Sequence, residues 1–432
     1  MRPMSRLPQR LAAIGVLLLS MAIVAVLAVR ALGIPLAIGP LASPTPVIGS
    51  PTPSAGSPAP SLDELEAFAD IEAEVRDLRN LPAPDIGPPE ILTRAQLAEE
   101  LRVIFDETWT PEELERDNLA LRAMGLLGHD QDLRELTEQL YAGQVLGFYE
   151  FERKRMVVVS DAGLTPEARV TYAHEYTHAL QDAAFDTGAA HEAQVGDDDA
   201  ALARLAIEEG DASVVMVLWA IEHLTPEEQL GISQTPLPDM TGIPDWMIAQ
   251  LEFPYLTGSQ FVGQLWASGG WDAVDAAYAD PPDSTEQVIH PEKYLDAEEP
   301  MPVVGPELAA GLATTAGGDW VDVEEMTIGE AMIGIWLQGL GVDERAATTA
   351  AAGWGGDSMT VASGPDGDWS LAWRIAWDFP QHATEFEDTY ARIGANIGFG
   401  TRYVRLSDTE TLVVHASTEE LAEQTVAVAG GG

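Results

Sequence analysis

Apolar and polar residues alternate along the chain with two different spacings. From about residue 61 onward, apolar side chains recur every three or four positions, as in Leu62, Leu65 and Phe68, which is the spacing of one helix face. This spacing predicts helices over 62–78, 93–105, 111–127, 130–141, 253–267 and 271–278. We expect these helices to be packing elements, because each presents an apolar stripe to a core.

The chain between residues 145 and 185 changes from strand to helix. Residues 145–151 and 156–160 are rich in aromatic and β-branched side chains and are separated by a charged turn, which predicts a β-hairpin. Thr165 and Pro166 then suit the start of a helix, since threonine caps well and proline is tolerated at the first helical position. The predicted helix covers 166–185.

Beyond about residue 300 the composition shifts to Ala, Gly and Trp, and a two-residue spacing appears. Trp369, Trp373 and Trp377 alternate with small or polar residues, which predicts a half-buried strand over 369–377. A helix over 380–393, strands over 403–406 and 411–415, and a last helix from residue 418 complete a small α+β unit. We interpret the tryptophans as core residues rather than a polysaccharide surface, and the unit as accessory or substrate-positioning.

The first 60 residues predict an exported chain. Residues 11–29 are uncharged and span about 28 Å as a helix, close to the roughly 30 Å of a bilayer interior. Arg2, Arg6 and Arg10 precede this run and Arg30 alone follows it, which predicts a cytoplasmic tail over 1–10 and a single-pass anchor in the cell membrane. Cleavage as a signal peptide is the alternative and would give a secreted protein. Residues 30–60 read as a Pro/Ser-rich linker.

Composition restricts both partners and ligands. The formal net charge is −48 and the only lysines are Lys154 and Lys293, which argues against a nucleic-acid partner. Cysteine is absent, so His and carboxylate side chains are the strong zinc ligands that remain. The 432 residues, 46% of them hydrophobic, are sufficient for two folded domains.

His174 and His178 lie on one face of the predicted 166–185 helix, one turn apart. Glu175 lies beside them, where it can reach a water on a metal held by the two imidazoles. This spacing predicts catalytic zinc, which usually takes three protein ligands and keeps one position for water.

The third ligand must come from further along the chain. Ala184 stands where a metzincin would have its third histidine, so that class is excluded. The remaining candidates are His191, Glu192, Glu208 and Glu209. Glu209 interrupts an apolar helical stripe, where a carboxylate needs a partner such as a metal, whereas Glu208 is expected on a more polar side and His191 in a loop. We predict Glu209, with a structural pairing to arginine as the alternative.

The motifs His-Glu-Tyr-Thr-His at 174–178 and Glu-Glu-Gly-Asp-Ala at 208–212 resemble the gluzincin branch of zinc metallopeptidases. The resemblance covers residues 61–296 and implies zinc on His174, His178 and Glu209, with Glu175 as general base. Gluzincins place an orienting acid four positions after the third ligand, where this chain has Ser213, so Asp211 and Asp182 are both candidates for that role. The strand before the zinc helix would offer its edge to an extended peptide.

A group that stabilises the reacting oxyanion is also expected. Gluzincins usually supply a Tyr or His from a downstream helix, which points to His290 and Tyr294 within 283–294. The alternative is that His290, which precedes a proline, only caps helix carbonyls.

Together these patterns predict a mainly helical α+β fold: a zincin-like metallopeptidase domain over 61–300 with an N-terminal transmembrane helix, and a C-terminal α+β domain over 301–432. The predicted function is a membrane-anchored, zinc-dependent endopeptidase acting on peptide or protein substrates. The alternatives are a non-catalytic protein that zinc stabilises for binding or scaffolding, and an enzyme that cleaves another amide.

Overall fold

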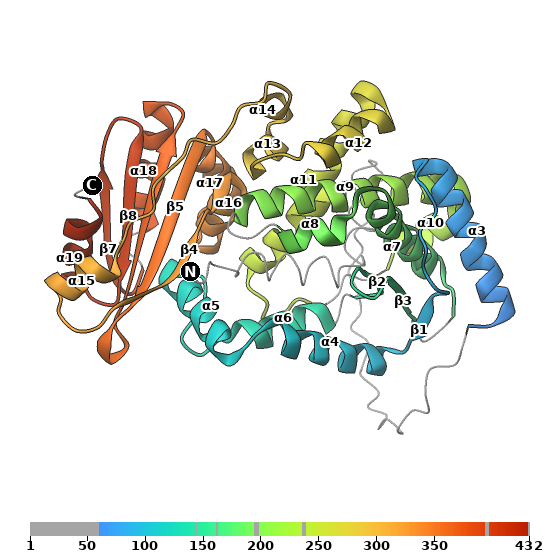
Figure 1. The fold of residues 1–432 in the computed structure, drawn as a ribbon, viewed down its shortest axis with the longest axis horizontal. Helices are drawn as coiled ribbons and strands as arrows, with labels where there is room; N and C mark the ends of the chain where they lie inside the picture. Colours follow the sequence, from blue (N-terminus) through green and yellow to red (C-terminus); the bar gives the residue numbers. More distant parts are fainter. Residues whose placement is uncertain are drawn as a thin grey trace.

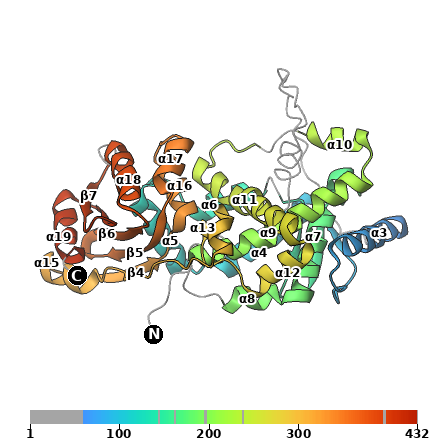
Figure 2. The same cartoon turned by 90° about the horizontal axis from the view of Figure 1, so that it is seen from above.

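The computed structural model describes residues 60–142, 145–160, 163–193, 198–235, 239–393 and 397–430. The described part is elongated, with a mainly helical region at one end and an antiparallel sheet at the other (Figures 1 and 2). Helices α4 to α6 run between the two ends (Figure 1). The helical region therefore lies beside the large sheet.

Several helices before residue 300 begin where the sequence offers a capping side chain. Ser61, Thr93 and Thr110 each close a capping box with the residue three positions on. The helices are Leu62–Arg79 (α3), Arg94–Thr108 (α4), Pro111–Met124 (α5), Leu133–Ala142 (α6), Pro166–Phe185 (α7), Thr187–Ala193 (α8), Asp198–His223 (α9), Pro226–Ser233 (α10), Asp245–Gly269 (α11), Trp271–Ala279 (α12), Thr285–Ile289 (α13) and Pro291–Leu295 (α14). The predicted helices are confirmed, most of them within a few residues at each end.

A small sheet packs against α7. Its strands are Glu90–Leu92 (β1), Gly147–Glu150 (β2) and Arg155–Val159 (β3), in the order β1-β3-β2. The predicted hairpin is confirmed as the antiparallel β2–β3 pair. β1 pairs in parallel with β3 and was not predicted, because three residues are too few to show a period.

The C-terminal region is built on a five-stranded antiparallel sheet. Its elements are Ala309–Thr315 (α15), Val321–Met326 (β4), Gly329–Gly339 (α16), Glu344–Ala351 (α17), Trp354–Ser363 (β5), Pro365–Gly367 (a 3-10 turn), Trp369–Trp377 (β6), Pro380–Ile393 (α18), Gly400–Arg405 (β7), Glu410–Ala416 (β8) and Glu419–Ala429 (α19). The strand order is β4-β5-β6-β8-β7. β6, α18 and the last two strands were predicted, whereas β4, β5, α16 and α17 were not.

Helices cover both faces of this sheet (Figure 2). Trp373 and Trp377 are buried on the face toward α16 and α18, as the core interpretation expected. Ala372 and Val414 are buried on the other face, in a cluster that includes residues of α15 and α19. The expectation of a half-buried strand was therefore wrong, because small residues on the second face admit a helix layer.

The helical region and the sheet share one hydrophobic core. A single buried cluster runs from Leu92 through the α4–α6 helices to Trp336 and Val413. The Trp336 indole N–H donates to the Met124 carbonyl over 2.9 Å, which ties α16 to the end of α5. The predicted boundary at residue 300 stays a prediction.

The fold prediction needs one correction, which concerns the membrane. The described helices include none that is both long and apolar enough to cross a bilayer. The 26-residue α9, for example, carries Glu208, Glu209 and Asp211 near its middle. The predicted span, 11–29, lies outside the described residues. The fold class is therefore corrected to mainly helical with a small sheet domain, and the predicted single-pass localisation at the cell membrane is corrected with it.

Candidate metal centre

Two packed helices carry the predicted metal ligands. In α7, Thr165 accepts a hydrogen bond from the Ala168 N–H and Pro166 occupies the first turn, which fixes where the helix starts. His174 and His178 then follow one turn apart, near the middle of the helix. Glu209 enters from α9, which packs along α7.

The structure brings the three predicted ligand atoms together. His174 Nε2 lies 3.1 Å from both His178 Nε2 and Glu209 Oε2, and His178 Nε2 lies 3.3 Å from Glu209 Oε2. Three ligands about 2.1 Å from a tetrahedral zinc ion would lie about 3.4 Å apart, close to these values. Among the described residues, this is the group of His and acidic side chains whose geometry could hold a metal ion.

A network behind His178 fixes the orientation of its ring. His178 Nδ1 pairs with Gln181 Oε1 at 2.9 Å, while the Gln181 amide N–H donates to Asp211 Oδ2 at 3.2 Å. Asp211 also accepts from Arg79 Nε at 2.8 Å and from the Tyr278 hydroxyl at 2.9 Å. Because Gln181 presents its carbonyl, Nδ1 carries the proton and Nε2 keeps its lone pair for a metal.

Asp211 and Asp182 were both expected to orient a ligand, and the structure separates them. Asp211 acts on His178 through Gln181. Asp182 instead accepts from the Tyr149 hydroxyl at 2.9 Å and from the Gly188 N–H at 3.2 Å. Gln181 was not predicted, although it lies three residues after His178 and thus on the same side of the helix.

Glu175 lies between strand β2 and the group of His174, His178 and Glu209, which we call the metal cluster. Its Oε2 accepts from the Tyr149 backbone N–H at 3.1 Å, and its buried Oε1 has no partner. Burial raises the pKa of Glu175 to about 8, against the effects of the His178 charge and the Tyr149 N–H. A carboxyl group with one oxygen held and the other unpaired can exchange a proton near neutral pH.

The charges of His178 and Glu209 stabilise each other. Burial alone would lower the pKa of His178, but the Glu209 carboxylate outweighs it and raises that pKa to about 10. Burial alone would raise the pKa of Glu209, and the two imidazoles lower it to about 2. The buried carboxylate thus requires positive charge beside it, which a proton or a metal cation supplies.

A close helix crossing places a tyrosine at the cluster. A Cβ added to Gly258 of α11 would lie 2.1 Å from the Ala206 carbonyl oxygen, and one added to Gly210 of α9 would lie 2.4 Å from Gly258. Only glycine permits this approach. One turn before Gly258, the Tyr255 ring stacks on the His174 ring at 6.0 Å between centroids, and its hydroxyl bonds to the Glu209 carboxylate. Tyr255 was missed because nothing in its local pattern separates it from a core aromatic.

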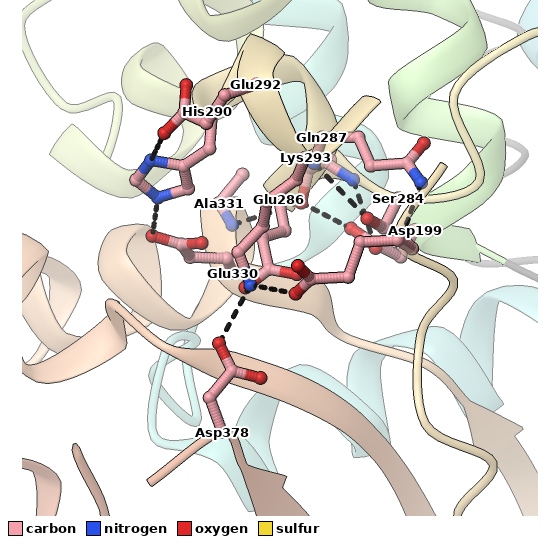
Figure 3. A network of polar contacts seen from close by, with 12 residues as sticks. Asp199, Ser284, Glu286, Gln287, His290, Glu292, Lys293, Glu330, Ala331 and Asp378 are labelled. Atoms are coloured by element: carbon pink, nitrogen blue, oxygen red, sulfur yellow. Dashed lines mark hydrogen bonds and ion pairs between the residues drawn. The ribbon is translucent and has the colours of Figure 1, made fainter. Parts of the chain in front are cut away.

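His290 and Tyr294 lie elsewhere, in contacts of their own. Figure 3 shows His290 beside two carboxylates, and its Nε2 pairs with Glu330 of α16 at 3.0 Å. The Tyr294 hydroxyl donates to the Asp280 carbonyl at 2.8 Å, and its ring packs on Phe261. None of these partners belongs to the metal cluster, so the structure does not bring the two predicted residues together with it.

The other candidate ligands are also placed. Glu208 is buried, and its charge contributes to raising the pKa of Tyr278. His191 and Glu192 fall in helix α8, where a loop was expected. The structure places Glu209 against both imidazoles.

A partly enclosed pocket of about 80 Å³ adjoins the cluster. Tyr255 and Tyr141 form the part of its wall nearest Glu209, whose charge contributes to raising the pKa of both hydroxyls. The remainder of the wall is mostly apolar and comes from α5, α6, α9, α11 and residues 326–332. The pocket therefore lies next to the three predicted ligands.

One family model matches the chain, over residues 319–429, and is described as a domain of unknown function (DUF8575). The match covers the five-stranded sheet with α16 to α19 and leaves the metal cluster outside. No curated protein matches the chain, and no solved structure matches it.

Proposed function

We propose that the chain is a zinc-dependent endopeptidase. The observation that carries the proposal is the convergence of His174, His178 and Glu209 within 3.3 Å, with Glu175 beside them. The donor set fits zinc, since two neutral imidazoles and one carboxylate are a common catalytic combination. Bound zinc supplies Lewis acidity, which polarises a carbonyl and lowers the pKa of a water toward about 7.

Glu175 is the proton carrier of the proposed reaction. Its unpaired Oε1 accepts the proton of the attacking water, and the same carboxyl group then protonates the leaving amine. The Tyr149 N–H holds the other oxygen and so keeps the side chain in place. A zinc site that only stabilised the fold would need no such carboxyl group.

Tyr255 is the proposed oxyanion stabiliser, in place of His290 and Tyr294. Its hydroxyl already lies at the Glu209 carboxylate, and burial with the neighbouring negative charges raises its pKa well above the usual value. The hydroxyl therefore stays protonated, and its O–H, which donates to Glu209 in this structure, would turn to donate to a developing oxyanion.

Cleavage of an unfolded protein by the full chain tests the proposal. We expect zinc-dependent cleavage that a chelator abolishes and that Glu175→Gln reduces by roughly 10²–10⁴-fold with zinc retained. Glu167→Gln, in the first turn of the same helix, is the matched control and should cleave normally, because the amide keeps an oxygen that can accept from the Thr235 hydroxyl. Equal cleavage by the wild type and Glu175→Gln would exclude Glu175, and absence of cleavage would favour the binding or scaffold alternative.

A further inference from the structure

We infer that the C-terminal sheet domain forms one wall of the pocket beside the metal ligands, and that this pocket selects a Leu- or Met-sized aliphatic side chain next to the scissile bond. The inference rests on the proposed peptidase function and names the substrate class of that site. Its first support is position. Leu202 and Leu205 line the pocket and lie on the α9 face that continues, one turn later, to Glu209.

The second support is the origin of the opposite wall. Met326, Thr327, Ile328 and Met332 all line the pocket, and they come from the end of β4 and the start of α16. Met326 is the last residue of a strand in the five-stranded sheet. The region that follows the catalytic helices in sequence therefore completes the hollow that those helices begin.

Hydrogen bonds hold this wall in place. Asp357 of β5 accepts from the Ile328 and Gly329 backbone N–H groups, each at 2.9 Å. Thr285 binds Asp199, in the first turn of α9, through its backbone N–H at 3.1 Å, and its hydroxyl accepts from the Ala331 N–H at 3.1 Å. The wall is thus linked both to the sheet and to the helix that carries Glu209. Figure 3 shows Asp199 and Ala331 in this network.

The chemistry and size of the pocket define the occupant. Its lining is mostly Leu, Met, Ile and aromatic side chains, and the one charged side chain in it is Asp198, so apolar occupants are favoured and acidic ones are not. An apolar cavity of about 150 Å³ holds a benzene ring. At about 80 Å³ the pocket suits an aliphatic side chain better than phenylalanine or tryptophan.

Cleavage of a peptide set by the full chain tests the inference. The peptides differ only in the residue at each position flanking the scissile bond. At one flanking position, we expect kcat/KM for Leu or Met to exceed that for Ala, Trp or Asp by about 10-fold or more. A flat profile at both positions, in a preparation that does cleave peptides, would overturn the pocket assignment and leave the peptidase proposal intact. No zinc-dependent cleavage of any peptide would instead remove the peptidase proposal itself.

Two substitutions at Met332 test whether the C-terminal wall of the pocket causes any side-chain preference that the cleavage assay shows. Met332→Phe should fill the pocket and lower kcat/KM for Leu peptides about 10-fold, with little change for Ala peptides. Met332→Ala should enlarge it and raise relative cleavage of Phe peptides. Val304→Phe, at a position 80% exposed, is the control and should keep the wild-type profile. If either folded Met332 variant, with normal zinc content, kept the wild-type profile, the C-terminal wall would have no part in selection.

Discussion

At the scale of single residues, the proposed metal centre depends on Gln181, a side chain that is not one of the three proposed ligands. Gln181 accepts from His178 and donates both to Asp211 and to the Glu208 carbonyl. With both ends of the amide engaged, its carbonyl has one orientation, and His178 has one tautomer. The orientation of the His178 ring is therefore set by Gln181, the residue hydrogen-bonded to it.

Replacing the Gln181 amide should weaken zinc binding without unfolding the protein. We expect Gln181→Leu to lower zinc affinity by roughly 10–100-fold, because the His178 ring loses its fixed tautomer. A competition titration against a chromogenic chelator measures the change. Gln381→Leu, on the exposed side of α18, is the control. Unchanged affinity in Gln181→Leu would show that the ring needs no such partner.

Sequence reasoning at this scale succeeded where chemistry is local and failed where it depends on crossing helices. His174, Glu175 and His178 share one turn of α7, so their spacing alone predicts their arrangement. Glu209 was predicted because a carboxylate in an apolar stripe needs a partner. Tyr255 could not be found in this way, because its approach to His174 depends on how α11 crosses α9.

At the scale of elements, the crossing of α9 and α11 is the feature on which the site depends most. Gly210 directly follows Glu209, and Gly258 follows Tyr255 by one turn. Their missing side chains let the two backbones touch, which places the Tyr255 hydroxyl at the Glu209 carboxylate. The spacing of two glycines thus controls the distance between a ligand and its neighbour.

A methyl group at this crossing should separate the helices. Gly258→Ala is expected to destabilise the chain by about 1–3 kcal/mol and to weaken zinc binding, since overpacking displaces backbone. Gly263→Ala, on the same helix with open space around it, should instead stabilise by about 0.5–1 kcal/mol. Denaturant unfolding and a zinc titration of both variants measure these effects. Equal stability of the two variants would mean that the contact is not tight.

At the scale of elements too, features marked by local sequence were predicted, and features that depend on packing were not. The α7 helix and the β2–β3 hairpin were predicted because caps, a turn and a period mark them. Strand β5 was not predicted, because every residue from Trp354 to Ala362 is buried and no alternation is visible. Strand β6 of the same sheet was predicted, because large and small residues alternate along it even though both of its faces are covered.

At the scale of the whole molecule, the two regions are joined by packing and by polar contacts. One apolar cluster crosses between them, and Lys293 of α14 reaches Asp378, just after β6, at 2.8 Å (Figure 3). The sequence analysis divided the chain by composition, which does not reveal contacts between distant segments. The shared core explains how a C-terminal segment can shape a pocket beside ligands more than a hundred residues earlier.

The central claim is that His174, His178 and Glu209 hold one zinc ion. Calorimetric titration of the metal-free full chain with Zn²⁺, beside Glu209→Gln, tests it most directly. We predict one tight equivalent for the wild type and a marked loss of affinity in the variant, because the buried negative charge that balances the cation is gone. No tight zinc binding by the wild type, or undiminished binding by Glu209→Gln, would contradict the account.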